Sequence, residues 1–381
     1  MIRNNENKKE DRKILENAYQ NAQNIDLGLI SQNIKNNIDK LIDKIDSNKS
    51  LVSAIVTSLL KKIITPTQDI RLHRADFENG YSARMLDTQI TSPFFKDNFP
   101  KYANKESSFL TLATRERIKW TKTEGLSLKI RDKQLKDCFL NICDDVEIQN
   151  SSPDDYLMYI FTKLIALSEG TQMIFQNANL QTENLETLNI HLIIKMLESH
   201  FETKISSRLP VIAIYSVYEV LLPKFDRYKD KKLMPLQVHT SSDKHSFGDI
   251  EIYTLDNQPF EIIEIKHNIP IDKYLVFDIA KKSQNTAINR YYILTTFKDS
   301  FKDLDSEKEV IDYILELKKT QEIDIITNGI ISTLKYYLRF IDDYAEFINI
   351  YTKNLIEDAG KSTEIKDFHL EKWIEILKEK S

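Results

Sequence analysis

The chain has 381 residues, of which 41% are hydrophobic and 29% are charged, and its formal net charge is -5. This composition is typical of a globular protein with a substantial apolar core, and the length suits two domains or one large domain. The acidic balance argues against a protein that coats nucleic acid over its whole surface, although an enzyme can concentrate positive charge in one cleft. The start of the chain is too charged for a secretory signal, and no run of about eighteen apolar residues occurs. We therefore expect a cytoplasmic protein that does not enter a membrane.

The amino-terminal half predicts helices on both sides of an irregular segment. Apolar residues recur at three- and four-residue intervals over 26–63, which is the helical period, and Pro66 ends that run. Residues 66–131 have no such period and are rich in arginine, aromatic and small polar residues. The stretch SPDD that follows is a helix-start signal. From there we expect helices at 153–170, 183–202 and 209–222.

The carboxy-terminal half predicts a sheet followed by helices. LMPLQVHT, GDIEIYTL and PFEIIEIKH are short, alternating and rich in β-branched residues, which predicts strands, with a tight turn at 255–258. A helical pattern at IDKYLVFDIAKKSQNT and the strand RYYILTT follow, which gives the order helix, three strands, helix, strand. Beyond them we expect a helix near 307–319, a strand at 323–327, and helices at 329–358 and 362–380.

Together these elements predict an α/β fold. Residues 1–204 are expected to be a mostly helical region, 205–328 a mixed-sheet core, and 329–381 helices that pack on the core. The last part carries aromatic residues that we expect to be buried as one stripe: Tyr336, Tyr337, Phe340, Phe347 and Trp373.

Charged residues on the predicted hairpin have the spacing of a metal site. Strand alternation puts Asp249 and Glu251 on one face, and on the next strand it puts Glu264 and Lys266 on one face. An antiparallel hairpin can therefore bring Asp249, Glu264 and Lys266 to one end of the sheet. Two adjacent carboxylates repel each other, and a divalent cation relieves that repulsion. Hard oxygen ligands favour Mg²⁺, and a neighbouring lysine can orient the water needed to hydrolyse a phosphodiester.

This arrangement resembles the PD-(D/E)xK nuclease superfamily, with Asp249 as the acid of one strand and Glu264-Ile265-Lys266 as the tripeptide of the next. Gly248 stands where the family usually has proline. The resemblance implies a nuclease core, catalytic roles for Asp249, Glu264 and Lys266, and a metal ligand in the main-chain carbonyl of Ile265. Many members carry a further acid on the preceding helix, for which Glu219 is the candidate.

The alternative is that these side chains lie on the solvated face of an antiparallel sheet, where Glu and Lys are ordinary. Glu-x-Lys occurs five times, starting at Glu6, Glu202, Glu264, Glu316 and Glu364. Only Glu264 lies in an apolar strand, and isoleucines at 262, 263 and 265 indicate burial on both faces. We therefore favour the nuclease site.

Two further groups of metal-binding residue types are weaker candidates. His239, Asp243, Lys244 and His245 precede Asp249 and fit either a second metal site or, preferably, a polar loop. Cys138 and Cys143 lack a partner cluster, so we expect reduced thiols rather than a structural zinc site.

The irregular segment 66–131 is the candidate DNA-recognition region. Its sequence resembles the amino-terminal region of type II restriction enzymes related to the SacI family, which implies that it contacts bases. Arginine forks pair with guanine in the major groove. Alternatively, the arginines form internal salt bridges with the nearby acids Asp69, Asp76, Glu78 and Asp87. On the helix after the catalytic tripeptide, Lys281 and Lys282 fit either phosphate contacts or a solvated helix face. The candidates within the segment are Arg71, Arg74, Arg84, Arg115, Arg117 and Lys119.

The sequence thus predicts a type II restriction endonuclease that cleaves double-stranded DNA at a defined site with Mg²⁺ as cofactor. A homodimer would match a two-fold symmetric site. The resemblance also implies a cognate DNA methyltransferase that modifies the same site. The alternatives are a structure-selective or repair nuclease on the same core, and a non-catalytic DNA-binding protein that has kept a nuclease-like sheet.

Overall fold

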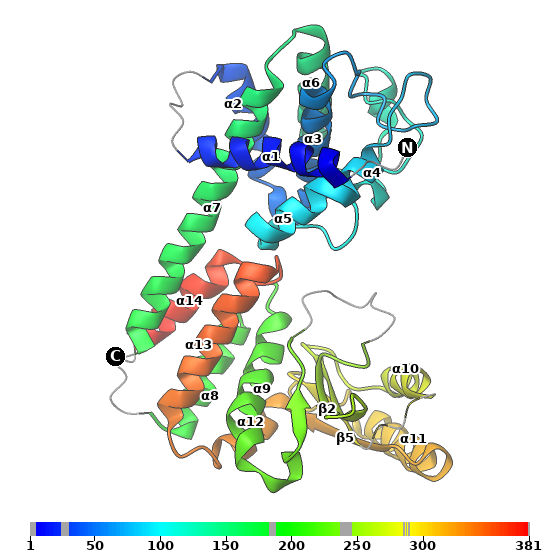
Figure 1. Cartoon of the computed structure of the whole chain (residues 1–381). Coiled ribbons are helices and arrows are strands. Elements are labelled where there is room, and N and C mark those ends of the chain that lie inside the picture. Colours follow the sequence, from blue (N-terminus) through cyan, green and yellow to red (C-terminus); the bar gives the residue numbers. More distant parts are fainter. Residues whose placement is uncertain are drawn as a thin grey trace. The chain divides into compact units, whose positions relative to one another are not determined.

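The computed structural model describes residues 5–23, 30–182, 188–236, 246–284, 286, 288 and 290–379, with side chains for all of these except 5 and 171–182. The chain divides into two compact units, Met1–Gln172 and Met173–Ser381 (Figure 1). Each unit is described by itself. His239, Asp243, Lys244 and His245 lie outside the described residues.

The first unit is built from α-helices joined by shorter helical turns. Ser31 caps α2 and Asp132 caps α6 with side-chain hydrogen bonds to the first-turn N–H groups. The α-helices are α1 (Asn5–Ala22), α2 (Gln32–Ile42), α3 (Ile45–Ile64), α4 (Ala83–Leu86), α5 (Ser92–Asn98), α6 (Lys133–Ile148) and the first part of α7 (Pro153–Thr182), which continues past the boundary at Gln172 into the second unit. A π-helix spans Asp87–Thr91, and 3-10 helices span Pro100–Tyr102, Ser108–Leu110 and Glu124–Ser127.

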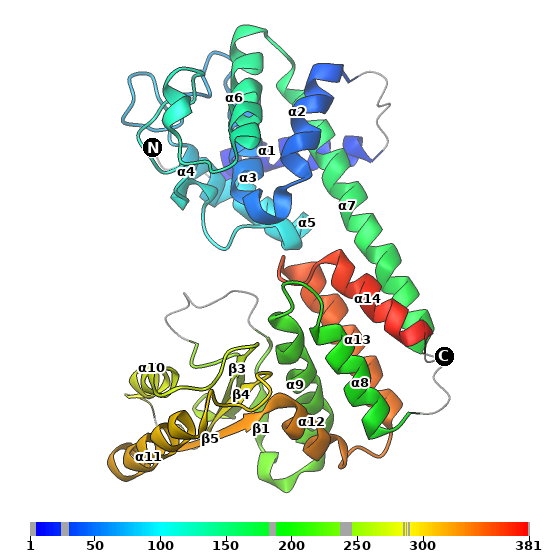
Figure 2. The same ribbon diagram turned by 180° about the vertical axis from the view of Figure 1, so that it is seen from behind.

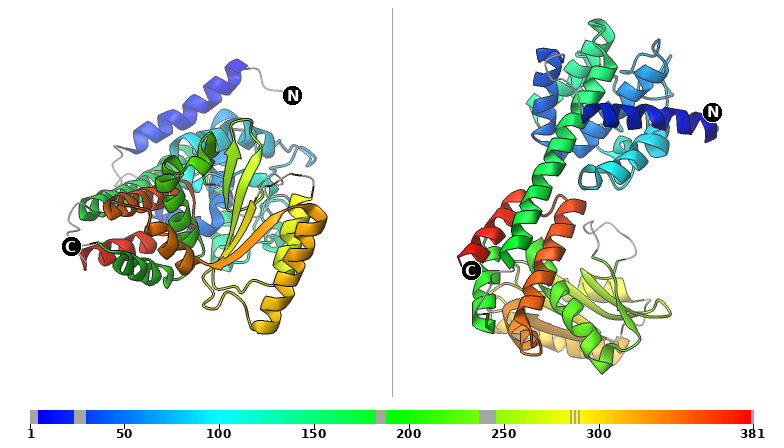
Figure 3. Two further views of the ribbon diagram at one scale, coloured as in Figure 1. Left: turned by 90° about the horizontal axis from the view of Figure 1, so that it is seen from below. Right: turned by 60° about the vertical axis from the view of Figure 1, so that its left-hand side comes forward.

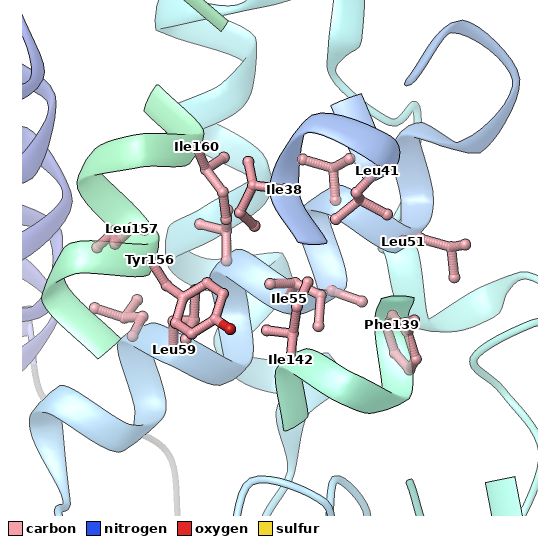
Figure 4. Packing of buried hydrophobic residues seen from close by; sticks show 14 of the residues in the cluster. Ile38, Leu41, Leu51, Ile55, Leu59, Phe139, Ile142, Tyr156, Leu157 and Ile160 are labelled. Carbon is pink, nitrogen blue, oxygen red and sulfur yellow. The ribbon is translucent and has the colours of Figure 1, made fainter. Parts of the chain in front are cut away.

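The core of the first unit forms around α3. Leu51, Ile55 and Leu59 recur on that helix at four-residue spacing and pack against side chains of α2, α6 and α7 (Figure 4). Cys138 and Cys143 are buried and free on α6. The segment 66–131 packs onto this core through aromatic rings rather than long helices, and its fully buried Trp120 stacks on His73 at 4.0 Å. The segment is therefore ordered without a regular hydrophobic period.

The second unit combines a sheet with two groups of helices. Its strands are β1 (Lys231–Leu233), β2 (Ile250–Thr254), β3 (Pro259–Lys266), β4 (Arg290–Thr295) and β5 (Asp324–Gly329). Its helices are α8 (Ile190–Phe201), α9 (Arg208–Leu221), α10 (Lys273–Ser283), α11 (Leu304–Gln321), α12 (Ile330–Leu338), α13 (Tyr344–Lys361) and α14 (Asp367–Lys378), with 3-10 turns at Leu222–Lys224 and Asp226–Tyr228.

The sheet is mixed, with strand order β1-β2-β3-β4-β5. β1, β2 and β3 pair antiparallel, whereas β3, β4 and β5 pair in parallel (Figure 2). In the register, Ile250 lies opposite Ile263, and Lys266 lies beside Thr295. The order helix, three strands, helix, strand, predicted from the sequence, is observed as α9, β1, β2, β3, α10 and β4.

Helices cover both faces of this sheet (Figure 3). Ile263 and Ile265 belong to the apolar cluster formed with α8, α9, α12, α13 and α14. Ile262 points to the other face and packs in the cluster formed with α10 and α11. The protein is therefore an α/β protein, and the predicted burial of β3 on both faces is confirmed. An open solvated sheet face at β3 is excluded.

Several sequence-based boundaries were wrong. The first strand, Lys231–Leu233, ends where the predicted strand 233–240 begins, and residues 237–240 of that prediction lie outside the described part of the chain. The sequence predicted two helices in the tail, but the structure has three, because the chain turns between Leu338 and Tyr344. Phe347 and Trp373 are fully buried as expected, but Tyr336 is 54% and Phe340 37% exposed. None of the described helices has the length and apolar character needed to cross a bilayer.

Candidate active site

Asp249 lies directly before β2, next to the last residues of β3. Its N–H donates to the Ile263 carbonyl at 2.9 Å, and its carboxylate accepts the Ile265 N–H at 2.7 Å. Gly248 permits this close approach, because a Cβ there would lie 2.6 Å from Cγ2 of Ile262 and 2.8 Å from the Ile263 carbonyl oxygen. A glycine before the acid is thus required by packing against β3.

Glu264 and Lys266 complete the cluster from β3. The Lys266 ammonium donates to the Glu264 carboxylate at 2.5 Å, and Glu264 is only 8% exposed. Burial, together with the charge of Glu264, raises the pKa of Asp249 to about 6. The three residues that the sequence predicted to meet are therefore side by side, as two crowded carboxylates with one lysine.

The protein supplies positive charge to this cluster but does not neutralise it. The Ile265 N–H, Lys266 and Arg208 all act to lower the pKa of Asp249, and it remains raised. Arg208, the first residue of α9, is itself buried and is held by the buried Asp358 of α13 at 2.7 Å. Much of its charge is thereby already compensated. The positive groups of the protein therefore only partly offset the negative charge of the carboxylate pair.

The end of β3 is tied to its neighbours through the residue after Lys266. One ring nitrogen of His267, Nε2, lies 3.0 Å from the Ser206 hydroxyl, and Nδ1 lies 2.9 Å from the Thr296 hydroxyl. The Thr296 N–H also donates to the Lys266 carbonyl at 3.0 Å. Burial lowers the pKa of the His267 ring, which joins the Ser206 and Thr296 hydroxyls as a tether. This tether fixes Lys266 relative to β4 and the start of α9.

Glu251 shares a face with Asp249, but its carboxylate binds the backbone of the preceding turn. Its carboxylate accepts the Phe247 N–H at 2.7 Å and the Ser246 hydroxyl at 3.2 Å. The Tyr291 hydroxyl donates to the Phe247 carbonyl at 2.6 Å on the same turn. Glu251 therefore stabilises the turn that presents Asp249.

The oxygen atoms at this edge suit a hard divalent cation. The N–H and C=O of one strand residue point to the same side, so the Ile265 carbonyl faces the β2 side, beside Asp249. Two carboxylates and one carbonyl are oxygen donors of the kind Mg²⁺ takes, and it keeps water in its remaining positions. Within the described part of the chain, no group of three or more His, Cys, Asp or Glu side chains is placed to hold a metal.

Glu219 is not brought to this cluster. It lies eleven residues beyond Arg208 on α9, roughly 16 Å along the helix axis. Its carboxylate accepts from the Asn354 amide at 2.8 Å and lies 3.9 Å from the Lys353 ammonium, both on α13. The predicted metal-ligand role of Glu219 is therefore not supported by its position.

Two of the DNA-recognition candidates are engaged inside the first unit. Arg71 donates to Asp69 at 2.8 Å and to Asp144 at 3.0 Å, and its side chain is only 19% exposed. Arg74 donates to Asp76 at 2.8 Å and to the Arg115 carbonyl at 2.8 Å. For Arg71 and Arg74 the internal salt bridges, which the sequence left as an alternative, are what the structure contains.

The other candidates are more accessible. Arg84 and Arg115 are exposed, and the Arg117 side chain is 68% exposed with its guanidinium 3.5 Å from Asp76. Lys119 lies 3.5 Å from Glu124. In the second unit, Lys281 and Lys282 are exposed in the last turn of α10, which follows the carboxyl end of β3 in the chain. These cations remain available to a ligand.

Sequence reasoning missed Arg208, His267 and Thr296. The sequence offered a signal only for His267, which directly follows Lys266. Arg208 and its partner Asp358 are 150 positions apart, and no local pattern connects them. No protein-family model matches the chain, and no curated protein matches it in sequence.

Proposed function

We propose that the chain is a Mg²⁺-dependent endonuclease that hydrolyses DNA phosphodiester bonds at the carboxyl end of β3. The observation that carries this proposal is the pairing of the half-buried Asp249 with the buried Glu264, with the pKa of Asp249 raised to about 6 and Lys266 alongside. Two neighbouring carboxylates whose charge is only partly offset destabilise the fold, and a bound metal ion would relieve that repulsion. The element order and the tripeptide Glu264-Ile265-Lys266 support a PD-(D/E)xK core.

The residues would divide the work as follows. When bound, Mg²⁺ supplies charge neutralisation and a more acidic water. Asp249, Glu264 and the Ile265 carbonyl would hold it. Lys266, steadied by Glu264 and by the His267 tether, would place its positive charge and N–H donors against the phosphate and the attacking water. Gly248 keeps Asp249 close enough to β3 to share the ion.

The resemblance of 66–131 to restriction enzymes supports a site-specific, type II activity on double-stranded DNA. One such site cuts one strand, so a homodimer is the simplest way to cut both strands of a two-fold site. The accessible cations Arg84, Arg115 and Arg117 would contribute to recognition, and Lys281 and Lys282 to phosphate contacts. A cognate methyltransferase would protect the host's DNA in the cytoplasm.

The test is digestion of supercoiled plasmid DNA with Mg²⁺, Mn²⁺, Ca²⁺ or excess chelator. We expect cleavage with Mg²⁺ or Mn²⁺, binding without turnover with Ca²⁺, and no cleavage with chelator. The chain provides a matched control: Glu316 and Lys318 form a second Glu-x-Lys on the exposed face of α11, so Glu316→Ala should cleave normally. Discrete fragments identify a restriction enzyme, whereas smears identify a repair or structure-selective nuclease. Full activity in chelator would refute the mechanism.

A further inference from the structure

A basic and aromatic surface lies at the opposite end of β3 from the carboxylate pair. It is formed by two segments, 224–232 and 335–340, which we call the amino-end patch. These segments contain seven Lys or Arg residues and two acidic residues, in a chain whose net charge is -5. The patch therefore carries a local excess of positive charge, whereas the whole chain has a negative net charge.

Aromatic contacts join the two segments into one surface. The rings of Phe225 and Phe340 meet at 5.3 Å. The Arg339 guanidinium lies over Tyr336 at 4.1 Å and over Phe340 at 4.5 Å. The Lys231 ammonium lies 4.9 Å from the Phe260 ring at the start of β3. These rings position the cations without removing their charge.

Most of these cations keep their charge uncompensated. Lys224 pairs with Glu346, and Arg227 pairs with the buried Glu261. The remaining five have no carboxylate within ion-pair distance among the residues that the structure describes: Lys229, Lys231, Lys232, Lys335 and Arg339.

We propose that the amino-end patch binds the phosphate backbone of nucleic acid, as a second DNA contact region apart from the catalytic edge. Uncompensated cations interleaved with exposed aromatics, Tyr336 at 54% and Phe340 at 37%, suit phosphates and bases together. The eight residues of β3 separate the patch from Lys266 by roughly 23 Å, about seven base pairs of duplex. That the nucleic acid is DNA rests on the proposed function. That the surface is basic and aromatic is an observation independent of that function.

The test compares two charge-reversal variants of the full chain on a 30-base-pair duplex in chelator, which prevents cleavage. The patch variant is Lys229→Glu/Lys231→Glu/Arg339→Glu. The control, Lys308→Glu/Lys318→Glu/Lys319→Glu, makes the same change in net charge on exposed lysines of α11. We expect the patch variant to bind at least ~10-fold more weakly than the control, and its salt slope to fall by up to ~0.9 per lost phosphate contact. Thermal unfolding checks that both variants are folded.

Equal binding by the folded patch variant and the control would overturn the proposal. So would loss of binding to vesicles containing anionic phospholipid with unchanged DNA binding, because the partner would then be a membrane surface. The outcome is separable from the proposed activity. If the wild-type protein binds DNA through the amino-end patch but never cleaves it, the patch proposal stands and the nuclease proposal is refuted. If the protein cleaves DNA and the patch variant binds like the control, the nuclease proposal stands and the patch proposal is refuted.

Discussion

Two glutamates three residues apart on β3 have opposite surroundings. Glu261 is fully buried, and its carboxylate accepts from the Tyr218 hydroxyl, the Tyr228 hydroxyl and the Arg227 guanidinium, each at 2.9 Å. Glu264 is nearly as buried, but it has Lys266 on one side and the Asp249 carboxylate nearby. One carboxylate is satisfied by its own protein, and the other shares a site with a second negative charge.

This difference separates a structural acid from a candidate functional one. A buried carboxylate with three donors has no need of a ligand, and its removal orphans those donors. A carboxylate that faces another carboxylate destabilises the fold unless something else binds. Glu261 should therefore matter for stability and Glu264 for activity.

The largest expected effect is loss of DNA cleavage when the residues at the carboxyl end of β3 are changed. Asp249→Ala, Glu264→Ala and Lys266→Ala should each reduce the cleavage rate at least ~10²-fold, because each removes a proposed metal ligand or the lysine proposed to face the phosphate. DNA binding, measured by titration in Ca²⁺, should be largely preserved. Wild-type cleavage by Asp249→Ala or Glu264→Ala would show that the carboxylate pair is not the active site.

The reverse pattern is expected at Glu261. Glu261→Ala should lower the free energy of unfolding by about 3 kcal/mol, since it leaves two buried tyrosine hydroxyls and a guanidinium without their acceptor. Urea denaturation measures the loss, and the cleavage rate per folded molecule should not change. A fully stable Glu261→Ala that has lost activity would remove the distinction between the two glutamates.

The pH dependence of stability offers a third test. The pKa of Asp249 is about 6 in the folded chain against an ordinary 3.8, so between these pH values the folded state binds more protons than the unfolded state. Stability should therefore fall as pH rises from about 4 to about 6, by up to about 3 kcal/mol, and then level off. Asp249→Asn should abolish this component and be more stable than wild type at pH 8 in chelator.

The measurement is urea unfolding of both proteins across this pH range, with the wild-type curve subtracted from the variant curve. A flat difference would mean that the carboxylates do not repel each other in solution. Adding Mg²⁺ at pH 8 should raise the melting temperature of wild type, since a ligand bound only by the folded state stabilises it. The Asp249→Asn variant should not respond, because it lacks the carboxylate proposed to hold the ion.

Strand alternation in the sequence was sufficient to predict the hairpin, the shared face of Glu264 and Lys266, and the element order. These follow from local periodicity, which the sequence carries directly. The three tail helices were harder, because the apolar period continues across the turn before Tyr344. The exposure of Tyr336 likewise depends on which neighbours the fold provides.

The support around the site was not predictable for a different reason. Arg208 meets Asp358 across 150 positions, and His267 meets Ser206 across 61. Such contacts depend on how helices pack, and the local periodicity of a sequence carries no sign of them. Glu219 was chosen because it lies on the preceding helix, but only the packed structure shows that this turn of α9 faces α13.

The smallest expected effects extend the same comparison to the arginines of the first unit. Arg71 is satisfied by Asp69 and the buried Asp144, so Arg71→Ala should lower stability by about 2 kcal/mol by orphaning that acid. Arg84 is exposed, and Arg84→Ala should leave stability unchanged but weaken DNA binding by ~1–3 kcal/mol if it contacts a base. Binding titrations on cognate and scrambled duplexes compare the DNA affinities of the two variants, and thermal unfolding compares their stabilities. If Arg71→Ala stays fully stable but loses discrimination, the Arg71 ion pairs must open on DNA. The ion pairs of Arg71 with Asp69 and Asp144 would then belong to the DNA-free state, and Arg71 would have a role in recognition as well as in stability.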